Sequence, residues 1–192
     1  MVTTAYNADG NVSSVTASNA STGPQTTQYV YGTTLSDSEI ATSLLKRAEI
    51  YPDSTGGSDQ IMFAYNRQSQ VTTMVDQGGT THTYDYDKLG RQTQDRVTAL
   101  SSGVDGAVRR IASTYEVRGM RQTLTSYDNA TVGSGNIVND NKFVYNHFSQ
   151  LTTEYQSHSG AVNMSTTAKV QYGYASGTAN TVRATNLVYP SG

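Results

Sequence analysis

The hexapeptide Tyr86-Asp87-Lys88-Leu89-Gly90-Arg91 is the stretch that decides the fold. An aspartate that follows a strand can accept hydrogen bonds from its own backbone and begin a turn. A glycine three residues later tolerates a positive φ. Alternating residues precede this hexapeptide, and polar residues follow it. The hexapeptide therefore predicts a β-hairpin whose loop of about three to five residues contains a β-bulge.

The same spacing occurs in five stretches: a tyrosine, then Asn, Asp or Glu, then two free positions, then Gly or Ser. An isolated hairpin is marginally stable in water, so repeated hairpins must stack side by side to bury their tyrosines. The sequence thus predicts an all-β fold, a curved strip of consecutive antiparallel β-hairpins. The residues that we expect to hold the repeats are Tyr6, Asn7, Gly10, Tyr65, Asn66, Ser69, Tyr86, Asp87, Gly90, Arg91, Tyr115, Glu116, Gly119, Tyr145, Asn146 and Ser149.

A larger repeat is also visible, in which tyrosine pairs of the Tyr-x-Tyr type lead to a Tyr-Pro step. The two Tyr-Pro steps lie 138 residues apart, at positions 51 and 189. Because proline cannot donate to a β-ladder, we expect each step at the end of a strand. We interpret residues 1–192 as a single hairpin array that is incomplete at both ends, with a large module at roughly 31–174. The residues that mark the module are Tyr31, Tyr51, Pro52, Tyr174, Tyr189 and Pro190.

Two segments depart from this pattern. Ser36 is followed three residues later by Glu39, which is a capping-box spacing, and apolar residues continue at helical spacing to Leu44. This pattern predicts one or two helical turns near residues 37–44, followed by a strand over residues 45–51. The acidic and amide-rich residues 139–141 lack the spacing of a calcium loop, and we interpret them as a turn.

The composition excludes several classes of protein. The 192 residues are 35% hydrophobic and 15% charged, with a net charge of -2, so there is no basic surface for nucleic acid or for an anionic membrane. The absence of cysteine excludes disulfides, thiolate metal sites and a cysteine nucleophile. No apolar run approaches the roughly 18 residues of a membrane span. Patterned Thr, Tyr and Val favour strands with a thin core over disorder.

The titratable residues do not form a recognisable catalytic, cofactor or metal site. None of the three histidines has a second histidine three or four residues away, which is the spacing typical of a metal site. Asp85 and Asp87 flank Tyr86, and on a regular strand they would share one side, as an acid/base pair or a cation site requires. The turn role of Asp87 explains this pair better. We therefore expect no enzymatic activity and no cofactor.

The stretch at residues 86–91 resembles the YD-repeat signature of RHS-repeat proteins, and the other four stretches are similar to its variants. Ser69 and Ser149 stand where the family has glycine, Glu116 stands for its aspartate, and Arg91 alone matches its arginine. The resemblance covers most of the chain. It implies a secreted or cell-surface polypeptide, usually bacterial and much longer, whose hairpin strips spiral into a hollow shell. In bacterial RHS proteins and in the C component of ABC-type insecticidal toxins, such shells can enclose a toxin domain.

From this resemblance we expect a structural segment that forms part of a β-shell or stalk and encloses a toxin or other cargo. Its partner would be the remainder of the parent repeat protein, and its location extracellular or at the cell surface. The alternative is an adhesin-like module that binds carbohydrate or a partner protein, because related repeats are often described as carbohydrate-binding and the chain is rich in Tyr, Asn and Gln. No copy of the family's boundary motif is present, so the resemblance implies no self-cleaving aspartyl site here.

Overall fold

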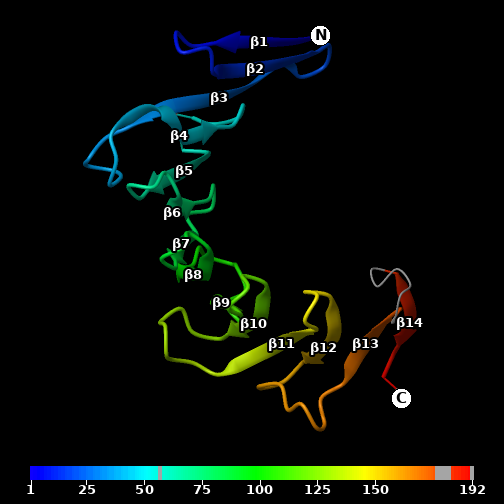
Figure 1. The fold of residues 1–192 in the computed structure, drawn as a ribbon. Coiled ribbons are helices and arrows are strands. Elements are labelled where there is room, and N and C mark those ends of the chain that lie inside the picture. The colour runs from blue at the N-terminus through cyan, green and yellow to red at the C-terminus, as the bar shows by residue number, and fades with distance from the viewer. Residues whose placement is uncertain (56–57, 176–182, 191–192) are drawn as a thin grey trace. The chain divides into compact units, whose positions relative to one another are not determined.

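The computed structural model describes residues 1–55, 58–175 and 183–190, and within these ranges it contains fourteen β-strands and no helix (Figure 1). Each strand pairs with the next one along the chain, in the order β1 to β14. The predicted all-β fold of consecutive antiparallel hairpins is confirmed. The strands are β1 Val2–Tyr6, β2 Val12–Asn19, β3 Gly23–Thr33, β4 Thr42–Ile50, β5 Gln60–Tyr65, β6 Val71–Val75, β7 Thr81–Tyr86, β8 Gln92–Ala99, β9 Arg110–Tyr115, β10 Arg121–Tyr127, β11 Ile137–Tyr145, β12 Leu151–Ser157, β13 Lys169–Tyr174 and β14 Ala184–Val188.

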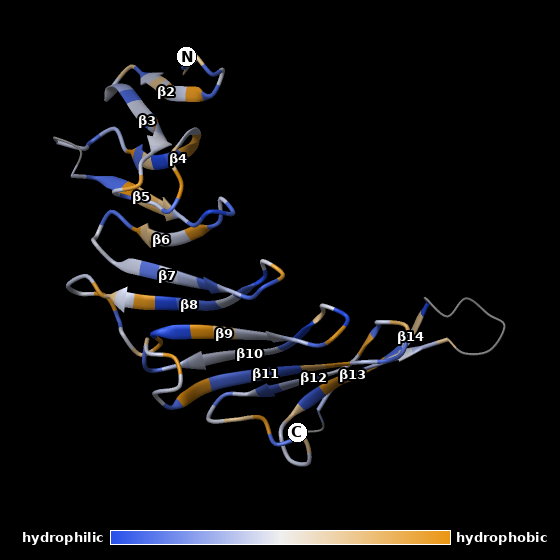
Figure 2. Ribbon diagram, turned by 60° about the vertical axis from the view of Figure 1, so that its left-hand side comes forward, coloured by the Kyte–Doolittle hydropathy of each residue, from blue (hydrophilic) through white to orange (hydrophobic). Residues whose placement is uncertain are grey.

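The chain divides into two compact units. Unit 1 comprises Met1–Asp85 and Val97–Val104, and unit 2 comprises Tyr86–Arg96 and Asp105–Gly192. Polar and apolar residues are mixed along the strands of each unit (Figure 2). The buried hydrophobic side chains among the described residues are Ala48 and Tyr65 in unit 1 and Tyr155 in unit 2. Because the core is this small, hydrogen bonds and the local structure of the turns contribute much of the stability of the strands.

The register of the strands shifts beside the motif tyrosines. Pairing between β5 and β6 slips between Ala64 and Tyr65, and pairing between β11 and β12 slips between Val144 and Tyr145. A shift of this kind marks a β-bulge, in which one strand carries an extra residue. These two hairpins therefore close through bulged turns, and the pairing also shifts beside Tyr6 and Tyr115. No helix in the described part of the chain is long and apolar enough to cross a membrane.

The predicted helical turn near residues 37–44 is wrong. Residues 34–41 form a turn and bends, and Leu44 lies inside β4. One turn does close, because the Ser38 N–H donates to the Thr34 carbonyl at 2.9 Å. The next backbone group leaves the helical path: the Glu39 N–H donates to the Tyr65 carbonyl at 2.8 Å. Leu44 is 64% exposed, so the expected apolar face would have had little to pack against.

The interpretation of residues 139–141 as a turn is also wrong, because they lie in the middle of β11. The carboxylate of Asp140 is buried there, and both of its oxygens accept hydrogen bonds. Thr125 donates from its hydroxyl at 2.7 Å, and the N–H of Val162 donates at 2.8 Å. A buried acidic side chain is tolerated in a strand when its oxygens are satisfied in this way. The contact with Val162 also fastens the β12–β13 connection to the sheet.

Candidate functional site: a ladder of tyrosines and turns

The motif turn at Asp87 shows how the repeat is built. The Asp87 N–H donates to the Arg91 carbonyl at 2.9 Å, and the Gly90 N–H donates back to the Asp87 carbonyl at 2.9 Å. One oxygen of the Asp87 carboxylate accepts hydrogen bonds from the backbone N–H groups of Leu89 and Arg91, at 2.9 and 3.0 Å. The side chain thus satisfies two backbone donors of the loop, which is the reason for an Asp or Asn at this position.

The other four motif turns repeat the two backbone bonds. They start at Asn7, Asn66, Glu116 and Asn146, with backbone distances between 2.8 and 3.1 Å. The three asparagines use their side-chain oxygen as Asp87 uses its carboxylate. The glutamate side chain accepts one backbone N–H, that of Arg118, at 3.2 Å. The five turns therefore share one construction, in which the polar side chain after the tyrosine is committed to its own loop.

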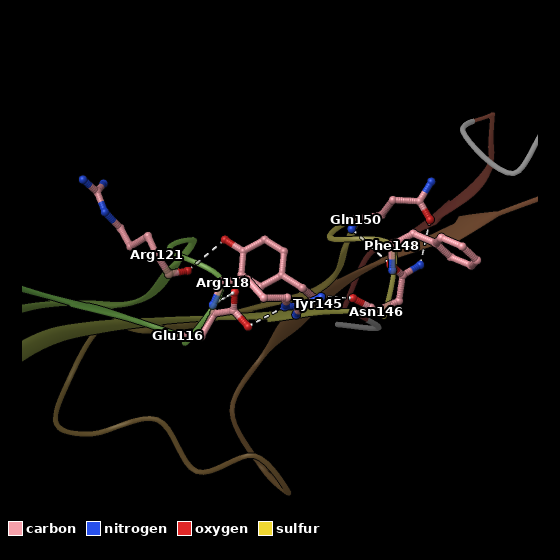
Figure 3. Close-up of polar contacts among 7 residues, drawn as sticks. All are labelled: Glu116, Arg118, Arg121, Tyr145, Asn146, Phe148 and Gln150. Atoms are coloured by element: carbon pink, nitrogen blue, oxygen red, sulfur yellow. Dashed lines mark hydrogen bonds and ion pairs between the residues drawn. The ribbon is translucent and has the colours of Figure 1, made fainter. Parts of the chain in front are cut away.

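The fourth turn position has a positive φ in every repeat. It is 78° at Gly90, and it is 63° at Ser69 and 66° at Ser149, where the sequence lacks the glycine. A left-handed conformation costs a non-glycine residue about 1–2 kcal/mol. The two serine turns have an additional side-chain bond: Asn66 donates to Gln70 at 2.9 Å, and Asn146 donates to Gln150 at 2.7 Å (Figure 3). This bond offsets part of the strain.

Arginine links neighbouring hairpins in unit 2. Arg91 forms an ion pair with Asp87 at 2.7 Å, and its guanidinium lies 4.4 Å from the centre of the Tyr115 ring in the next hairpin. The hydrogen bond from Arg91 holds the pKa of the Asp87 carboxyl below its ordinary value. Arg118 pairs with Glu116 at 2.8 Å and donates to the carbonyl of Asn146, one hairpin further on, at 2.6 Å (Figure 3).

The tyrosine hydroxyls form the second link between hairpins. Tyr115 donates to the carbonyl of Gln92 at 2.8 Å, and Tyr145 donates to the carbonyl of Arg121 at 2.8 Å (Figure 3). Arg121 is the residue that pairs with Tyr115 across its hairpin. Each tyrosine therefore reaches back to the strand that follows the preceding tyrosine. Burial is the main reason that the pKa of the Tyr145 hydroxyl lies above its ordinary value.

Two further contacts obey the same rule and involve tyrosines that we assigned to the larger module. Tyr174 donates to the carbonyl of Leu151, the residue paired with Tyr145, at 2.9 Å. Tyr65 donates to the carbonyl of Lys46 at 2.6 Å, and Lys46 pairs with Tyr31. Tyr31 and Tyr174 thus occupy the position of a repeat tyrosine. We call the set Tyr6, Tyr31, Tyr65, Tyr86, Tyr115, Tyr145 and Tyr174, one in each of the seven hairpins, the tyrosine ladder.

Sequence reasoning missed this role of Tyr31 and Tyr174 because longer connections replace the short motif turn after them. The structure places Tyr51 and Tyr189 differently: each follows the last residue of a strand, β4 and β14 respectively, with Pro52 and Pro190 next in the chain. Burial raises the pKa of the Tyr51 hydroxyl above its ordinary value.

A sixth turn of the same construction was also missed, between β6 and β7. The Asp76 N–H donates to the Thr80 carbonyl at 3.0 Å, the Gly79 N–H donates back to Asp76 at 3.0 Å, and the Asp76 carboxylate accepts the Thr80 N–H at 2.8 Å. Gly79 has a φ of 89°. The Asp-x-x-Gly spacing alone was the available signal, because no tyrosine precedes this turn.

The polar groups of the ladder and its turns bind the backbone and neighbouring side chains of the same chain. The carboxylate of Asp87 accepts hydrogen bonds within its own turn and forms an ion pair with Arg91. His82 stacks against Tyr84 with 6.1 Å between ring centres. In the part of the chain that the structure describes, no three His, Cys, Asp or Glu residues come together as a metal site would require.

A cavity of about 400 Å³ lies in unit 1, against β3 to β6. Apolar residues dominate its lining, among them Val30, Ile50, Met62 and Val75. Asp37 and Arg47 also line it. Its apolar character suits a hydrophobic group better than a sugar, since sugar sites need several hydrogen-bonding side chains.

Comparisons with solved structures show the fold. The chain aligns over 91% of its length with 9% of a chain in the crystal structure of TcdB2-TccC3-Cdc42, at a TM-score of 0.63 and 13% identity. It aligns over 88% of its length with 8% of a chain in the crystal structure of TcdB2-TccC3-TEV, at a TM-score of 0.57 and 10% identity. It therefore spans less than a tenth of either chain. No family model and no curated protein matches the sequence.

Proposed function

We propose that this chain is a non-catalytic structural segment of an extracellular or cell-surface RHS/YD-repeat protein, and that it forms part of the wall of a β-shell or stalk. The tyrosine ladder carries this proposal. Its hydroxyls donate hydrogen bonds to backbone carbonyls of the same chain. The Asn and Asp side chains of the turns accept hydrogen bonds from the backbone of their own loops. The repeated residues therefore hold the hairpins in register.

The shared fold with the TcdB2-TccC3 chains supports a repeat relationship of the RHS type. A wall that encloses a toxin or another cargo domain in a bacterial protein is the more detailed form of the proposal. This form rests on two observations. The motif at residues 86–91 resembles the YD-repeat signature of RHS-repeat proteins, and the chain shares its fold with part of the TcdB2-TccC3 chains. The remainder of the parent repeat protein is the partner that this role requires.

The structural role predicts that the repeated side chains matter for stability and not for ligand binding. We expect Tyr145→Phe and Asn146→Ala to lower the free energy of unfolding of the chain. Leu89→Ser is the matched control, because this residue is 77% exposed at a turn tip. A glycan array with the purified chain should give no saturable signal.

Two results would overturn the structural role. The first is saturable glycan binding that disappears in Tyr145→Phe while the variant stays folded. The second is a hydrolytic activity of the purified chain that is lost in Asp85→Asn or Asp87→Asn.

The second candidate function is a partner-binding module, and the apolar cavity of unit 1 favours it over a glycan site. A hydrophobic side chain of a partner protein would fill this cavity. Met62→Lys would place a charge in the cavity and abolish binding of such a partner. If the chain has only the structural role, the original chain binds no partner at this cavity, and Met62→Lys changes no binding.

A further inference from the structure

The floor of the unit 1 cavity is one face of four neighbouring strands, β3 to β6. A row of directly paired residues crosses all four strands, and each of them lines the cavity: Val30, Ala48, Met62 and Val75. Side chains that pair directly across neighbouring strands share one face of a sheet. Met62 is 44% exposed, so this apolar face is open to a ligand.

The connection between β3 and β4 contributes one wall of the cavity and is fastened to β5. The Glu39 N–H donates to the Tyr65 carbonyl at 2.8 Å, and the Tyr65 N–H donates to the Ser38 hydroxyl at 3.1 Å. Asp37 of this connection lines the cavity. Both oxygens of its carboxylate accept hydrogen bonds from Thr34, at 3.0 and 2.8 Å, which hold the pKa of the Asp37 carboxyl below its ordinary value. This carboxylate is therefore engaged in its own turn.

A β-bulge turns Arg47 into the same cavity. Val30 of β3 pairs with Ala48, but the next residue of β3 pairs with Lys46, so Arg47 is an extra residue on β4. Neighbours on a regular strand point to opposite faces of the sheet. A bulge changes the direction of a side chain. The bulge explains why Arg47 and Ala48, which are neighbours in the chain, both line the cavity.

The guanidinium of Arg47 is available to a ligand. Among the described residues it makes no hydrogen bond and no ion pair, whereas Arg91 and Arg118 are each paired with a carboxylate. Its charge has the smallest of the effects that set the pKa of Asp37, so Asp37 does not neutralise it. The planar fork of a guanidinium binds a carboxylate through two parallel hydrogen bonds. The cavity thus combines an apolar floor with one uncommitted cation.

We propose that the cavity of unit 1 binds an apolar carboxylate. The hydrocarbon part of the ligand covers the row from Val30 to Val75, and its carboxylate pairs with Arg47. The volume of about 400 Å³ lies within the range of small-ligand sites. A fatty acid and the C-terminal residue of a peptide share this chemistry. The peptide source rests on the second candidate function, whereas the wall role is independent of either source.

Calorimetric titration of the full chain with octanoate tests this proposal. Octanol offers the same hydrocarbon chain without the charge, and butyrate offers the charge with a shorter chain, so octanoate should bind more tightly than either. Arg47→Gln should weaken octanoate binding by about 2- to 12-fold, the value of one hydrogen bond, and leave octanol binding unchanged. Arg67→Gln removes the same charge at an exposed turn of unit 1 and is the matched control. Circular dichroism checks that both variants keep their strands.

A short acetylated peptide that ends in leucine, as the free acid and as the amide, distinguishes the two sources. Tighter binding of the free acid than of octanoate identifies a partner's C-terminus, and the reverse order identifies a fatty acid. Equal binding of acid and amide, or octanoate binding that is unchanged in Arg47→Gln, overturns the carboxylate and leaves the second candidate function standing. No saturable binding of any probe overturns both. The wall role survives each outcome, because it concerns contacts within one chain.

Discussion

Replacing Tyr65 with phenylalanine removes one hydroxyl from the most buried rung of the tyrosine ladder. Tyr65 is 7% exposed, and its hydroxyl donates to the Lys46 carbonyl at 2.6 Å. A hydrogen bond contributes about 0.5–1.5 kcal/mol net, and a buried acceptor left unsatisfied costs about 1–3 kcal/mol. We expect Tyr65→Phe to lower the free energy of unfolding of unit 1 by about 1–3 kcal/mol.

The same substitution at two other ladder positions should lower the free energy of unfolding by less. The hydroxyl of Tyr115 makes its bond at an exposed place, where water can replace the lost partner, so Tyr115→Phe should cost less, about 1 kcal/mol or below. Tyr6→Phe should cost nothing measurable, because Tyr6 is 65% exposed and none of the described residues accepts a bond from its hydroxyl.

Native-state hydrogen exchange is the suitable assay, because the chain divides into two compact units and a single global free energy of unfolding is well defined only for a single cooperative domain. In Tyr65→Phe, amides of β4 and β5 should exchange about 5- to 150-fold faster, and amides of β11 and β12 should not change. The midpoint of thermal unfolding of unit 1 should fall by about 4–8 °C for each kcal/mol, as for a domain of its size. Equal effects of Tyr65→Phe and Tyr6→Phe, or no effect of either, would refute the hydroxyl ladder.

The pH dependence adds an independent check. Burial raises the pKa of the Tyr65 hydroxyl above its ordinary value, so the folded chain keeps this proton more tightly than the unfolded chain does. The resulting stability is complete below the unfolded pKa of about 10 and is lost as the pH rises through the folded pKa. The stability difference between the original chain and Tyr65→Phe should therefore shrink above about pH 10, and a difference that grows there contradicts the assignment.

Three further predictions concern the turns and the buried carboxylate. Ser149→Gly should raise stability by up to about 1 kcal/mol in urea unfolding, because it relieves a φ of 66°, and Gly90→Ala should lower it by about 1–2 kcal/mol. Because the pKa of Asp87 is lowered by Arg91, this pair should contribute stability above about pH 4 that is lost as the pH falls through the folded pKa, and Asp87→Asn should remove that acid sensitivity. Asp140→Ala should cost about 1–3 kcal/mol and speed hydrogen exchange in residues 158–164, because it releases Val162, and unchanged exchange there would contradict this role.

Much of the fold could be predicted from the sequence because the turn chemistry is local. The five motif stretches contain both the side chain that starts each turn and the residue that takes the positive φ, within six positions. The expected helix failed for a complementary reason. The spacing of Ser36 and Glu39 describes one turn of chain, whereas the bond from Glu39 to Tyr65 that ended it joins residues far apart in the sequence.

The candidate site was predicted only in part. The motif tyrosines were recognised as packing residues, but their hydroxyl acceptors lie one hairpin away at positions with no common residue type: Lys46, Gln92, Arg121 and Leu151. A backbone carbonyl is the acceptor in each case, and every residue type has one, so the sequence carries no signal of the contact. The prediction of a turn at Asp140 failed for a similar reason, because its hydrogen-bond partner Thr125 belongs to the neighbouring strand.

The sequence by itself determined the class of fold and the place of the motif hairpins, because a turn is decided by residues that are neighbours in the chain. Only the tertiary structure decided that Tyr31 and Tyr174 belong with the repeat tyrosines. That role depends on which carbonyl each hydroxyl reaches. That choice is made by strand pairing across hairpins, where the partners are distant in sequence and only the backbone takes part.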